Sequence, residues 1–544
     1  MGGRLFVTDS KEVSKAIQRV SETRWDGING KSCYLEAKVK EKNPTMRILE
    51  LKPEKIIDGS FMEEYRNILD EEMRDNKTLI NAFSPTERGN LLYELFLQHS
   101  GIEDQGDLCR KRYAAEPIRQ IFPINNAERK RDAEVMKLEL WAKRTINAEI
   151  TRQLRSLGLY ADYDLLLIPV YAELERRRLK ITNFVPDHIT GLLSNCAVKN
   201  SNLSMCLCDQ NGKKLTGTQD LFNRFKDTVI QGKVIQEKRS TRQITPPLLY
   251  DFLSLVQDLE FSNFYFSDIR ECLDTFYMNG FINYPYSGER KINQTVQEQM
   301  ASKEEILALY GRKEEWNPIV YGLPCEKKET AGGIMVLHHA GLPELFQTDT
   351  SIEKQIIERL LRRQIAITSQ PAKVETVSVL VKAGEYYFTG EREFLVHGGW
   401  RTEAYDESEQ KSETYLDAPV CLSDFALEYQ VQPKLYTAAG LITFLRIHGI
   451  TNDTIVEVLS TLGKGANSYA NNYKGQYIVR QADRKTMKQL PECLLSLNLA
   501  TELLADLQRV KSERLSPDQF MERVRQRISE IEKEIQKGAT ENEK

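Results

Sequence analysis

The chain has 544 residues, of which 41% are hydrophobic and 28% charged, a composition typical of soluble proteins with several domains or one multi-lobed enzyme. Its formal net charge of −4 excludes an overall basic surface, so any contact with nucleic acid has to use local basic patches. The nine cysteines include no C-x-x-C pair, which argues against a zinc site, and their scattered spacing fits a reducing cytosol. No apolar run reaches the length of about 18 residues that a membrane helix needs, so we expect a soluble cytoplasmic protein.

The first third of the chain alternates strand and helix patterns. Residues 5–8 predict a short strand, followed by a helix from Lys11 to about Val20. A second strand pattern at residues 78–82 leads into the helical pattern of residues 91–96. This alternation favours an α/β domain with a parallel sheet. A long polar helix is expected next, over residues 126–157.

The rest of the chain switches twice between helical and β-rich blocks. A charged helix ends at residues 183–186, because proline disfavours helix in the residue before it, and residues 187–245 are β-rich. Residues 246–345 are helical, and a second β-rich block covers residues 373–405. We infer that the two β-rich blocks build one discontinuous domain. The tail from Leu435 is helical, and Ser516 and Pro517 predict the start of its last helix.

The segment Gly280–Ser287 reads GFINYPYS and follows a Pro-Pro-Leu connection and a helix-like run. This order resembles the strand-cleaving core of type IA DNA topoisomerases. On this resemblance, Tyr284 takes the position of the nucleophilic tyrosine, whose phenolate attacks a phosphodiester and holds one DNA end covalently. The alternative is that Tyr284 is an ordinary amphipathic aromatic at a turn.

Further segments resemble the same family in the same order along the chain. They are residues 5–17, 112–122, 149–152, 183–186, 338–343, 399–401, 433–437 and 449–450. The resemblance implies a multi-domain α/β plus α+β toroid with an N-terminal Toprim-like parallel α/β domain, helical domains and a discontinuous β-rich arch. The expected domains are a Toprim-like domain (1–145), a helical core (146–200 and 406–544, with the C-terminal helix), a β-rich arch (201–250 and 373–405) and a helical domain carrying Tyr284 (251–372).

The family's Toprim site binds Mg²⁺ through a glutamate after the first strand and a later Asp-x-Asp-x-Glu cluster. Asp9 takes the first position as a candidate catalytic carboxylate, although it could equally be a carboxylate that favours a helix N-terminus. The later cluster aligns with residues 84–90, where both aspartates are lost. We therefore expect no metal ligands here, although Mg²⁺ is the family's cofactor, and neither a zinc site nor an organic cofactor. Carboxylates from elsewhere are a third possibility, for example Glu103, Asp104, Asp107 or Glu116.

The resemblance also assigns candidate residues around Tyr284. His338 would donate hydrogen bonds to the phosphate or tyrosine network, and Arg152 would hold a backbone phosphate of a single strand. Tyr286 stands where the family has an arginine, and Arg290 and Lys291 lie close enough in sequence to replace it. As alternatives, His338 is a satisfied histidine at a turn and Arg152 an exposed helix charge. The basic runs at residues 233–242 and 176–178 could line a DNA groove, but such runs are more often ordinary solvent-exposed faces.

These observations predict a divergent topoisomerase that binds single-stranded DNA, cleaves it through Tyr284 with a 5′-phosphotyrosine link, passes a strand and reseals the break. Because the acidic cluster is missing, we expect weakened or lost metal-dependent activity. The alternative is a scaffold of the same fold that binds DNA or a partner protein without catalysis. The expected partners are single-stranded DNA, with RNA as a second candidate, and a protein, but no membrane. The expected location is the cytoplasm, in association with the nucleoid.

Overall fold

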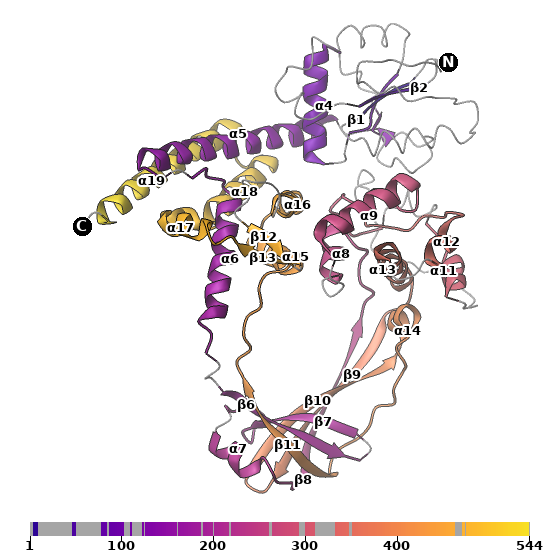
Figure 1. Ribbon diagram of the computed structural model, residues 1–544. Coiled ribbons are helices and arrows are strands. Elements are labelled where there is room, and N and C mark those ends of the chain that lie inside the picture. The colour runs from indigo at the N-terminus through magenta and orange to yellow at the C-terminus, as the bar shows by residue number, and fades with distance from the viewer. Residues whose placement is uncertain are drawn as a thin grey trace.

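The computed structural model describes residues 4–8, 46–50, 78–83, 86–102, 109–110, 122–123, 126–159, 161–185, 189–199, 201–216, 219–259, 264–292, 300–310, 332–347, 351–462, 470–473 and 475–542. The described elements form a ring (Figure 1), in which an N-terminal lobe lies above a helical core and a second helical lobe, and a β-barrel joins the two at the bottom. The multi-domain mixed fold predicted from the sequence is confirmed.

The N-terminal lobe is built on a five-stranded sheet of order β2-β1-β3-β4-β5. Its strands are β1 (Arg4–Thr8), β2 (Met46–Glu50), β3 (Thr78–Asn81), β4 (Cys109–Arg110) and β5 (Phe122–Pro123). Strand β1 pairs in parallel with β2 and β3, β3 pairs in parallel with β4, and β4 pairs antiparallel with β5. The buried Phe6 and Ile80 join the main hydrophobic core. Helix α4 (Glu87–Ser100) follows β3, with Thr86 as its N-cap.

The core is organised around the 31-residue helix α5 (Asn126–Ser156). Ala142, Ile146, Ile150 and Leu154 are buried, and their four-residue spacing places them on one face of the helix. This part of the ring also contains α6 (Leu167–Thr182), α15 (Ala438–Ile447), α16 (Asn452–Thr461), β12 (Ala470–Tyr473), β13 (Gln476–Val479), α17 (Asp483–Gln489), the 3₁₀ turn η2 (Glu492–Leu495), α18 (Asn498–Lys511) and α19 (Pro517–Asn542). The last helix begins at Pro517 as predicted, and the Ser516 hydroxyl accepts a hydrogen bond from Gln519 N.

Six strands close the barrel in the order β10-β7-β6-β11-β8-β9. They are β6 (Ile189–Val198), β7 (Ser201–Cys208), β8 (Ile230–Ile244), β9 (Ala372–Ala383), β10 (Tyr386–His397) and β11 (Pro419–Tyr429), with α7 (Gln219–Phe225) on the outside. The barrel therefore takes in β6 and β11. Strand β6 lies in the β-rich block predicted at residues 187–245, although the expected domain bounds placed residues 189–198 with the helical core, and β11 lies in a segment assigned to that core. In β11, the alternation of buried and exposed residues is irregular around the paired bulge at Ser423–Ala426, so its sequence carries a weak strand pattern.

The second helical lobe is an insertion between β8 and β9. It contains α8 (Phe252–Asp258), α9 (Phe266–Asn279), α11 (Lys303–Leu309), α12 (Leu342–Gln347) and α13 (Ile352–Ile367), and α14 (Gly399–Tyr405) packs on it from the far end of β10. Both of its connections run to the barrel. Its contact with the core, through α8 against α15 and α9 against α16, is therefore non-covalent. We call this contact the seam.

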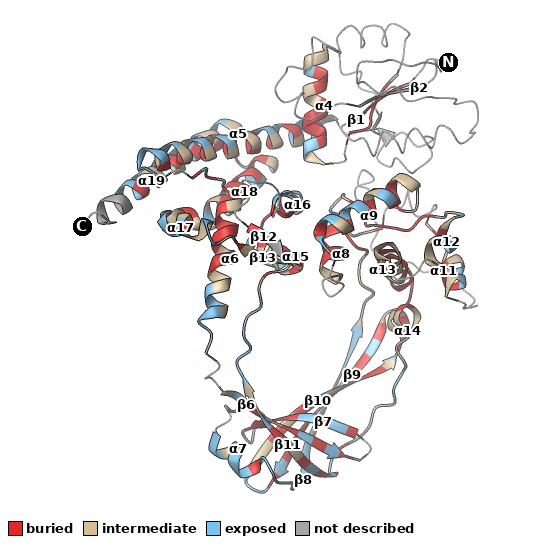
Figure 2. Ribbon diagram, in the orientation of Figure 1, coloured by how far each residue is buried: buried red, intermediate tan, exposed pale blue. Residues whose placement is uncertain are grey.

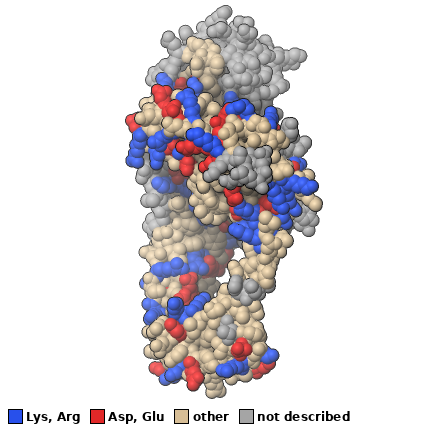
Figure 3. Space-filling view, turned by 90° about the vertical axis from the view of Figure 1, so that its left-hand side faces the viewer, with Lys and Arg blue, Asp and Glu red and all other residues tan. Residues whose placement is uncertain are grey.

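Burial and charge follow this division into lobes. Figure 2 shows buried residues on the facing sides of the helices and along the barrel strands, and the barrel has its own hydrophobic cluster. Figure 3 shows lysine and arginine side chains in separate clusters with acidic side chains among them, as the slightly negative net charge predicts. Among the described residues, no helix is long and apolar enough to cross a bilayer.

Candidate functional site

Tyr284 lies at the end of a short extended segment that follows α9. The helix ends at Gly280, whose φ of 80° lies in the left-handed region that glycine adopts without strain. The chain then pairs antiparallel with residues 334–337. Ile282 forms a bridge with Val336, Asn283 N donates to Met335 O (3.2 Å) and Leu337 N donates to Phe281 O (2.8 Å). Continuing this register sets Tyr284 beside Ile334, which on its other edge pairs with Tyr250.

The fully buried Asn283 side chain fixes this segment. Its amide nitrogen donates to Gly333 O (2.9 Å), and its amide oxygen accepts from Met335 N (2.7 Å). One side chain thus satisfies two backbone groups of the neighbouring strand. These two bonds fix the backbone directly before Tyr284. Asn283 could not be selected from its local sequence, because its partners are backbone atoms about 50 residues further along the chain.

The Tyr284 ring is 7% exposed and packs in an aromatic cluster. It meets the rings of Tyr277 and Tyr286 edge to face, each at a centroid distance of 5.7 Å. The Tyr286 hydroxyl donates to Asp274 (2.6 Å). Burial, followed by the negative charge of Asp274, raises the pKa of Tyr286 well above its usual value. Tyr286 therefore stays neutral and forms one wall around Tyr284, and its predicted role in DNA binding stays a prediction.

The loop after Tyr284 reaches the core at the N-terminus of α16. The Cβ position of Gly288 lies 3.5 Å from Asn452 Nδ2. The next residue, Asp453, has Glu87 at the start of α4 as an electrostatic neighbour. Glu87 in turn forms an ion pair with Lys511 of α18. The Tyr284 loop, the core and the N-terminal lobe thus meet at one junction, as Figure 1 shows for α9, α16 and α4.

Asp453 is the most perturbed carboxylate at this junction. Its side chain is exposed at the surface, but it is crowded by atoms of the surrounding elements. This desolvation, ahead of repulsion by Glu87 and Glu139, raises the pKa of Asp453 to about 6. A carboxylate that titrates near neutrality in such a position is a functional-site candidate.

The seam carries a second polar cluster centred on Asp251, which is 3% exposed. One of its oxygens caps α8 by accepting from Ser254 N (2.7 Å). The other accepts from Arg446 of α15 (2.9 Å) and from Asn452 Nδ2 (3.3 Å). Arg446 also donates to Gln257 Oε1 of α8 (2.9 Å). Asp251 and Arg446 therefore hold the two sides of the seam together, although neither was a candidate from the sequence.

Of the two basic candidates that follow Tyr284, Arg290 faces this cluster. Its Nε donates to Leu249 O (3.0 Å). Lys291 is held by its backbone, since its carbonyl accepts from Gly333 N (2.8 Å) and its own N donates to Glu289 (3.3 Å). Arg290 is thus the better placed of the two for an interaction at the seam.

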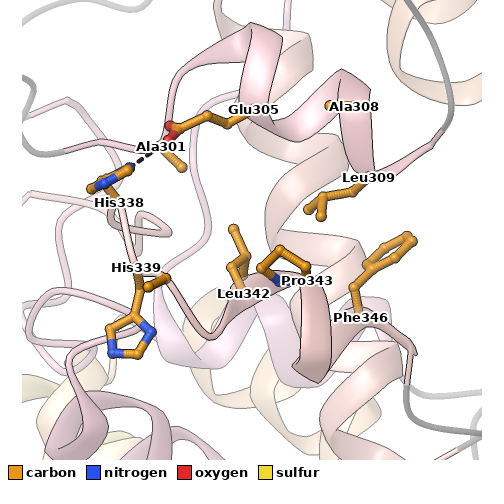
Figure 4. A pocket seen from close by; sticks show the side chains of 10 residues that line it. Ala301, Glu305, Ala308, Leu309, His338, His339, Leu342, Pro343 and Phe346 are labelled. Carbon is orange, nitrogen blue, oxygen red and sulfur yellow. Dashed lines mark ion pairs between the residues drawn. The ribbon is translucent and has the colours of Figure 1, made fainter.

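His338 lies on the strand beside Tyr284 but further along it. In the register of Ile282 and Val336, it is four residues beyond the partner of Tyr284, which corresponds to about 13 Å along a strand. Its side chain is 71% exposed and forms an ion pair with Glu305. The pair lies at the edge of a pocket of about 450 Å³ whose other walls are mainly apolar (Figure 4), formed by Ala301, Ala308, Leu309, Leu342, Pro343 and Phe346. His338 thus belongs to this pocket as much as to the surroundings of Tyr284.

Arg152 lies on the solvent side of α5. It pairs with Glu149 one turn earlier and with Glu532 of α19 (3.6 Å), and its side chain is 64% exposed. The hydrogen bond and charge of Glu149 raise its pKa, so it carries a full charge that these two carboxylates already neutralise in part. A phosphate contact at Arg152 stays a prediction.

The described residues do not fit a magnesium site. Asp9, Ser84 and the alternative carboxylates Glu103, Asp104, Asp107 and Glu116 lie outside them. Within the ranges that the structure describes, no three histidine, cysteine, aspartate or glutamate side chains are grouped as metal ligands would be. Glu87, from the stretch aligned with the family's acidic cluster, is bound by Lys511. We therefore derive no reaction step through a metal ion.

Comparison with known proteins identifies the family. A family model described as DNA topoisomerase matches residues 168–522, which is more than half of the chain. The chain belongs to the type IA DNA topoisomerase family. Its curated relatives in this family include DNA topoisomerase 1 of Pyrococcus horikoshii, 23% identical over 378 residues that cover 61% of this chain and 52% of the relative. DNA topoisomerase 1 of Methanothermobacter thermautotrophicus is 22% identical over 318 residues, covering 53% and 42%.

The topoisomerase fold is also found by structural comparison. Full-length topoisomerase I from Thermotoga maritima superposes with a TM-score of 0.71 at 12% sequence identity, covering 97% of this chain and 90% of that structure. At this identity the likeness shows the fold alone. The chain spans about half the length of the curated relatives it matches.

Proposed function

We propose that this protein binds a single strand of DNA at the junction of its three lobes and cleaves it through Tyr284. The observation that carries the proposal is the position of Tyr284, on a segment fixed by Asn283 and followed by a loop that reaches α16 and, through it, α4. The N-terminal sheet with its parallel strands would be the Toprim-like lobe of the family.

The proposed reaction is a reversible transfer of one phosphodiester bond. The phenolic oxygen of Tyr284 attacks phosphorus, the bond from phosphorus to the 3′ oxygen breaks, and a 5′-phosphotyrosine link forms. The proton leaves the phenol, and the 3′ oxygen gains one. Resealing is the same exchange in reverse, and the seam would open between the two steps so that a second strand can pass.

The surroundings of Tyr284 support a weakened reaction. Tyr286 occupies the place of an arginine and directs its hydroxyl to Asp274, so it offers no positive charge to a phosphate. Fewer charge-assisted contacts mean weaker stabilisation of the charge that develops on the transferred phosphate.

A catalytically inactive scaffold is the second candidate. The pairing of Glu87 with Lys511 favours it, because a carboxylate bound by lysine is a poor ligand for a metal ion. RNA in place of DNA, a protein partner and association with the nucleoid remain predictions.

Trapping of covalent adducts with denaturant tests the proposal. Single-stranded oligonucleotides labelled at the 3′ end should become attached to the protein, and those labelled at the 5′ end should not. Tyr284→Phe should abolish the adduct, and Tyr277→Phe, which alters a neighbouring ring of the same cluster, should keep it.

Two other outcomes decide between the alternatives. Salt-dependent binding of oligonucleotides without any adduct, at every divalent ion concentration, would favour the scaffold. Absence of both binding and adducts would refute the proposed function.

A further inference from the structure

Arg290 carries a charge that the protein leaves incompletely paired. Its guanidinium is half-buried, and Nε donates to Leu249 O. Within the described part of the chain, its two terminal nitrogens donate to no other group. Burial lowers the pKa of Arg290, and the nearby positive charges of Arg363 and Arg446 lower it further against the opposing effect of Asp251.

The carboxylates beside Arg290 and Tyr250 already have other partners. Asp251 is bonded to Arg446 (2.9 Å), and Asp258 pairs with Arg359 (3.2 Å). Arg363 lies over the Tyr250 ring, with its Cζ 3.9 Å from the ring centroid, and it donates to Leu248 O (3.3 Å). After these pairings, Arg290 and Arg363 remain as two neighbouring positive charges without a carboxylate of their own. Two like charges repel each other more strongly where water is partly excluded, so the binding of an anion between them would be favourable.

Arg290 and Tyr284 lie on the same short backbone segment. The Cβ position of Gly333 is 3.2 Å from the Arg290 carbonyl carbon and 2.5 Å from Leu249 Cβ, so only glycine allows these backbones to approach so closely. Tyr284 lies beside Ile334, the next residue. The Cα atoms of Arg290 and Tyr284 therefore each lie about 5 Å, the distance between neighbouring strands, from the dipeptide 333–334.

We propose that Arg290 binds a backbone phosphate next to the one that Tyr284 attacks, with Arg363 supplying a second positive charge. The proposal rests on the proposed function and adds to it a phosphate site. The planar guanidinium of Arg290 presents its two free nitrogens as a fork that fits two phosphate oxygens. Arg363, held by Tyr250 and Leu248, acts through charge. All residues named for this site belong to the lobe that carries Tyr284, so the site moves with Tyr284 when the seam opens.

Binding of a fluorescent single-stranded oligonucleotide, measured by anisotropy over a series of salt concentrations, tests this site. Arg290→Gln should weaken binding roughly 5- to 20-fold at low salt and reduce the slope of log K against log salt by about 0.7, the value for one phosphate contact of a single strand. Arg290→Lys should keep most of the slope but lose part of the affinity, because lysine keeps the charge without the fork. Arg224→Gln, on the exposed face of α7 at the far side of the barrel, is the matched control and should change neither quantity.

The outcomes separate this inference from the function on which it rests. If the unmodified protein shows salt-dependent binding and Arg290→Gln leaves the slope unchanged, the phosphate site is refuted and the proposed function stands. If both Arg290 variants lower Tm equally with the slope unchanged, Arg290 only supports the backbone of Leu249. If the unmodified protein does not bind the oligonucleotide at all, both proposals fail.

Discussion

At the scale of single residues, the position of Tyr284 depends on its neighbour Asn283. In the proposed function Tyr284 is a nucleophile and needs a fixed backbone, because a misplacement of about 1 Å can cost two orders of magnitude in rate. Asn283 provides this by bonding to both Gly333 O and Met335 N in a place without access to water. Tyr284 could be selected as a candidate from its motif, but the residue that holds it could not, since only the folded chain brings the partners of Asn283 together.

Asn283→Ala should lower the free energy of unfolding by about 2 kcal/mol, because it leaves one buried donor and one buried acceptor without a partner. Chemical denaturation measures this loss. Asn283→Asp keeps the acceptor for Met335 N and removes the donor to Gly333 O, so a different loss in the two variants would separate the two bonds. A loss below about 0.5 kcal/mol in Asn283→Ala would show that the segment is held by other contacts.

Asp453 gives a prediction of pH dependence. Its pKa is raised from 3.8 to about 6 in the folded protein, so the folded state binds this proton more tightly than the unfolded state. The carboxyl group therefore contributes stability at low pH, and this contribution is lost as the pH rises from about 4 to about 6.

Asp453→Asn should accordingly raise Tm at pH 7.5, by an amount equivalent to about 1 kcal/mol once solvent screening is allowed for, and the gain should fall to less than half at pH 4.5. Thermal scans at both pH values test this, with Asp162→Asn, at the surface pair with Arg155, as the control. An equal gain at both pH values would show that the charge of Asp453 is not its cause.

At the scale of helices and strands, the seam between α8 and α15 combines a helix cap with an ion pair. Asp251 fixes the first turn of α8 through Ser254 and binds Arg446 across the seam. The helices themselves were largely predictable from local patterns, as α5 and α19 show, because their buried faces repeat every three or four residues. The seam could not be predicted from local patterns. It depends on α8 facing α15 and α9 facing α16, and these helices are far apart in the sequence.

A double-mutant cycle with Asp251→Asn and Arg446→Gln should give a coupling energy of about 1–3 kcal/mol, since the carboxylate is almost fully buried. Denaturation of the two single variants and the double variant measures it. The pair Arg242 and Glu393 on the barrel, with both side chains about half exposed, is the control and should couple by less than about 1 kcal/mol. Equal coupling energies for the two pairs would mean that the Asp251–Arg446 pair stabilises the seam no more than an exposed ion pair would.

At the scale of the whole molecule, the ring is closed by a covalent path through the barrel and by a non-covalent contact at the seam. The N-terminal lobe is tied to the core by α5 and by Lys511, which binds both Glu87 and Asp132. The lobe that carries Tyr284 is therefore the part that can leave the core without a break in the chain. Its motion would be a hinge movement with the bend at the barrel.

Joining the two sides of the seam should stop this motion. Gln257 Nε2 donates to Thr443 Oγ1 (2.9 Å), so cysteines at these two positions can be linked by a short bifunctional thiol reagent. The linked protein should form the Tyr284 adduct at an unchanged level but lose strand passage, measured as relaxation of supercoiled DNA. Each single-cysteine variant treated with the same reagent is the control. Loss of the adduct as well would show that cleavage itself needs an open seam.

The pairing of β8 with β9 has a consequence for how such a lobe returns. The two strands stay hydrogen-bonded up to Ile244 and Ala372, and β10 pairs with β9 as far as His397 and Lys373, so both connections leave the barrel as part of one three-stranded ribbon. A narrow ribbon of this kind bends more readily across its face than within its plane. Under the proposed function, the inserted lobe would tilt away with little rotation about the ribbon, and its return would bring Tyr284 back to the broken end in the same orientation. Fidelity of rejoining would then be a property of the barrel, at the opposite end of the molecule from the chemistry.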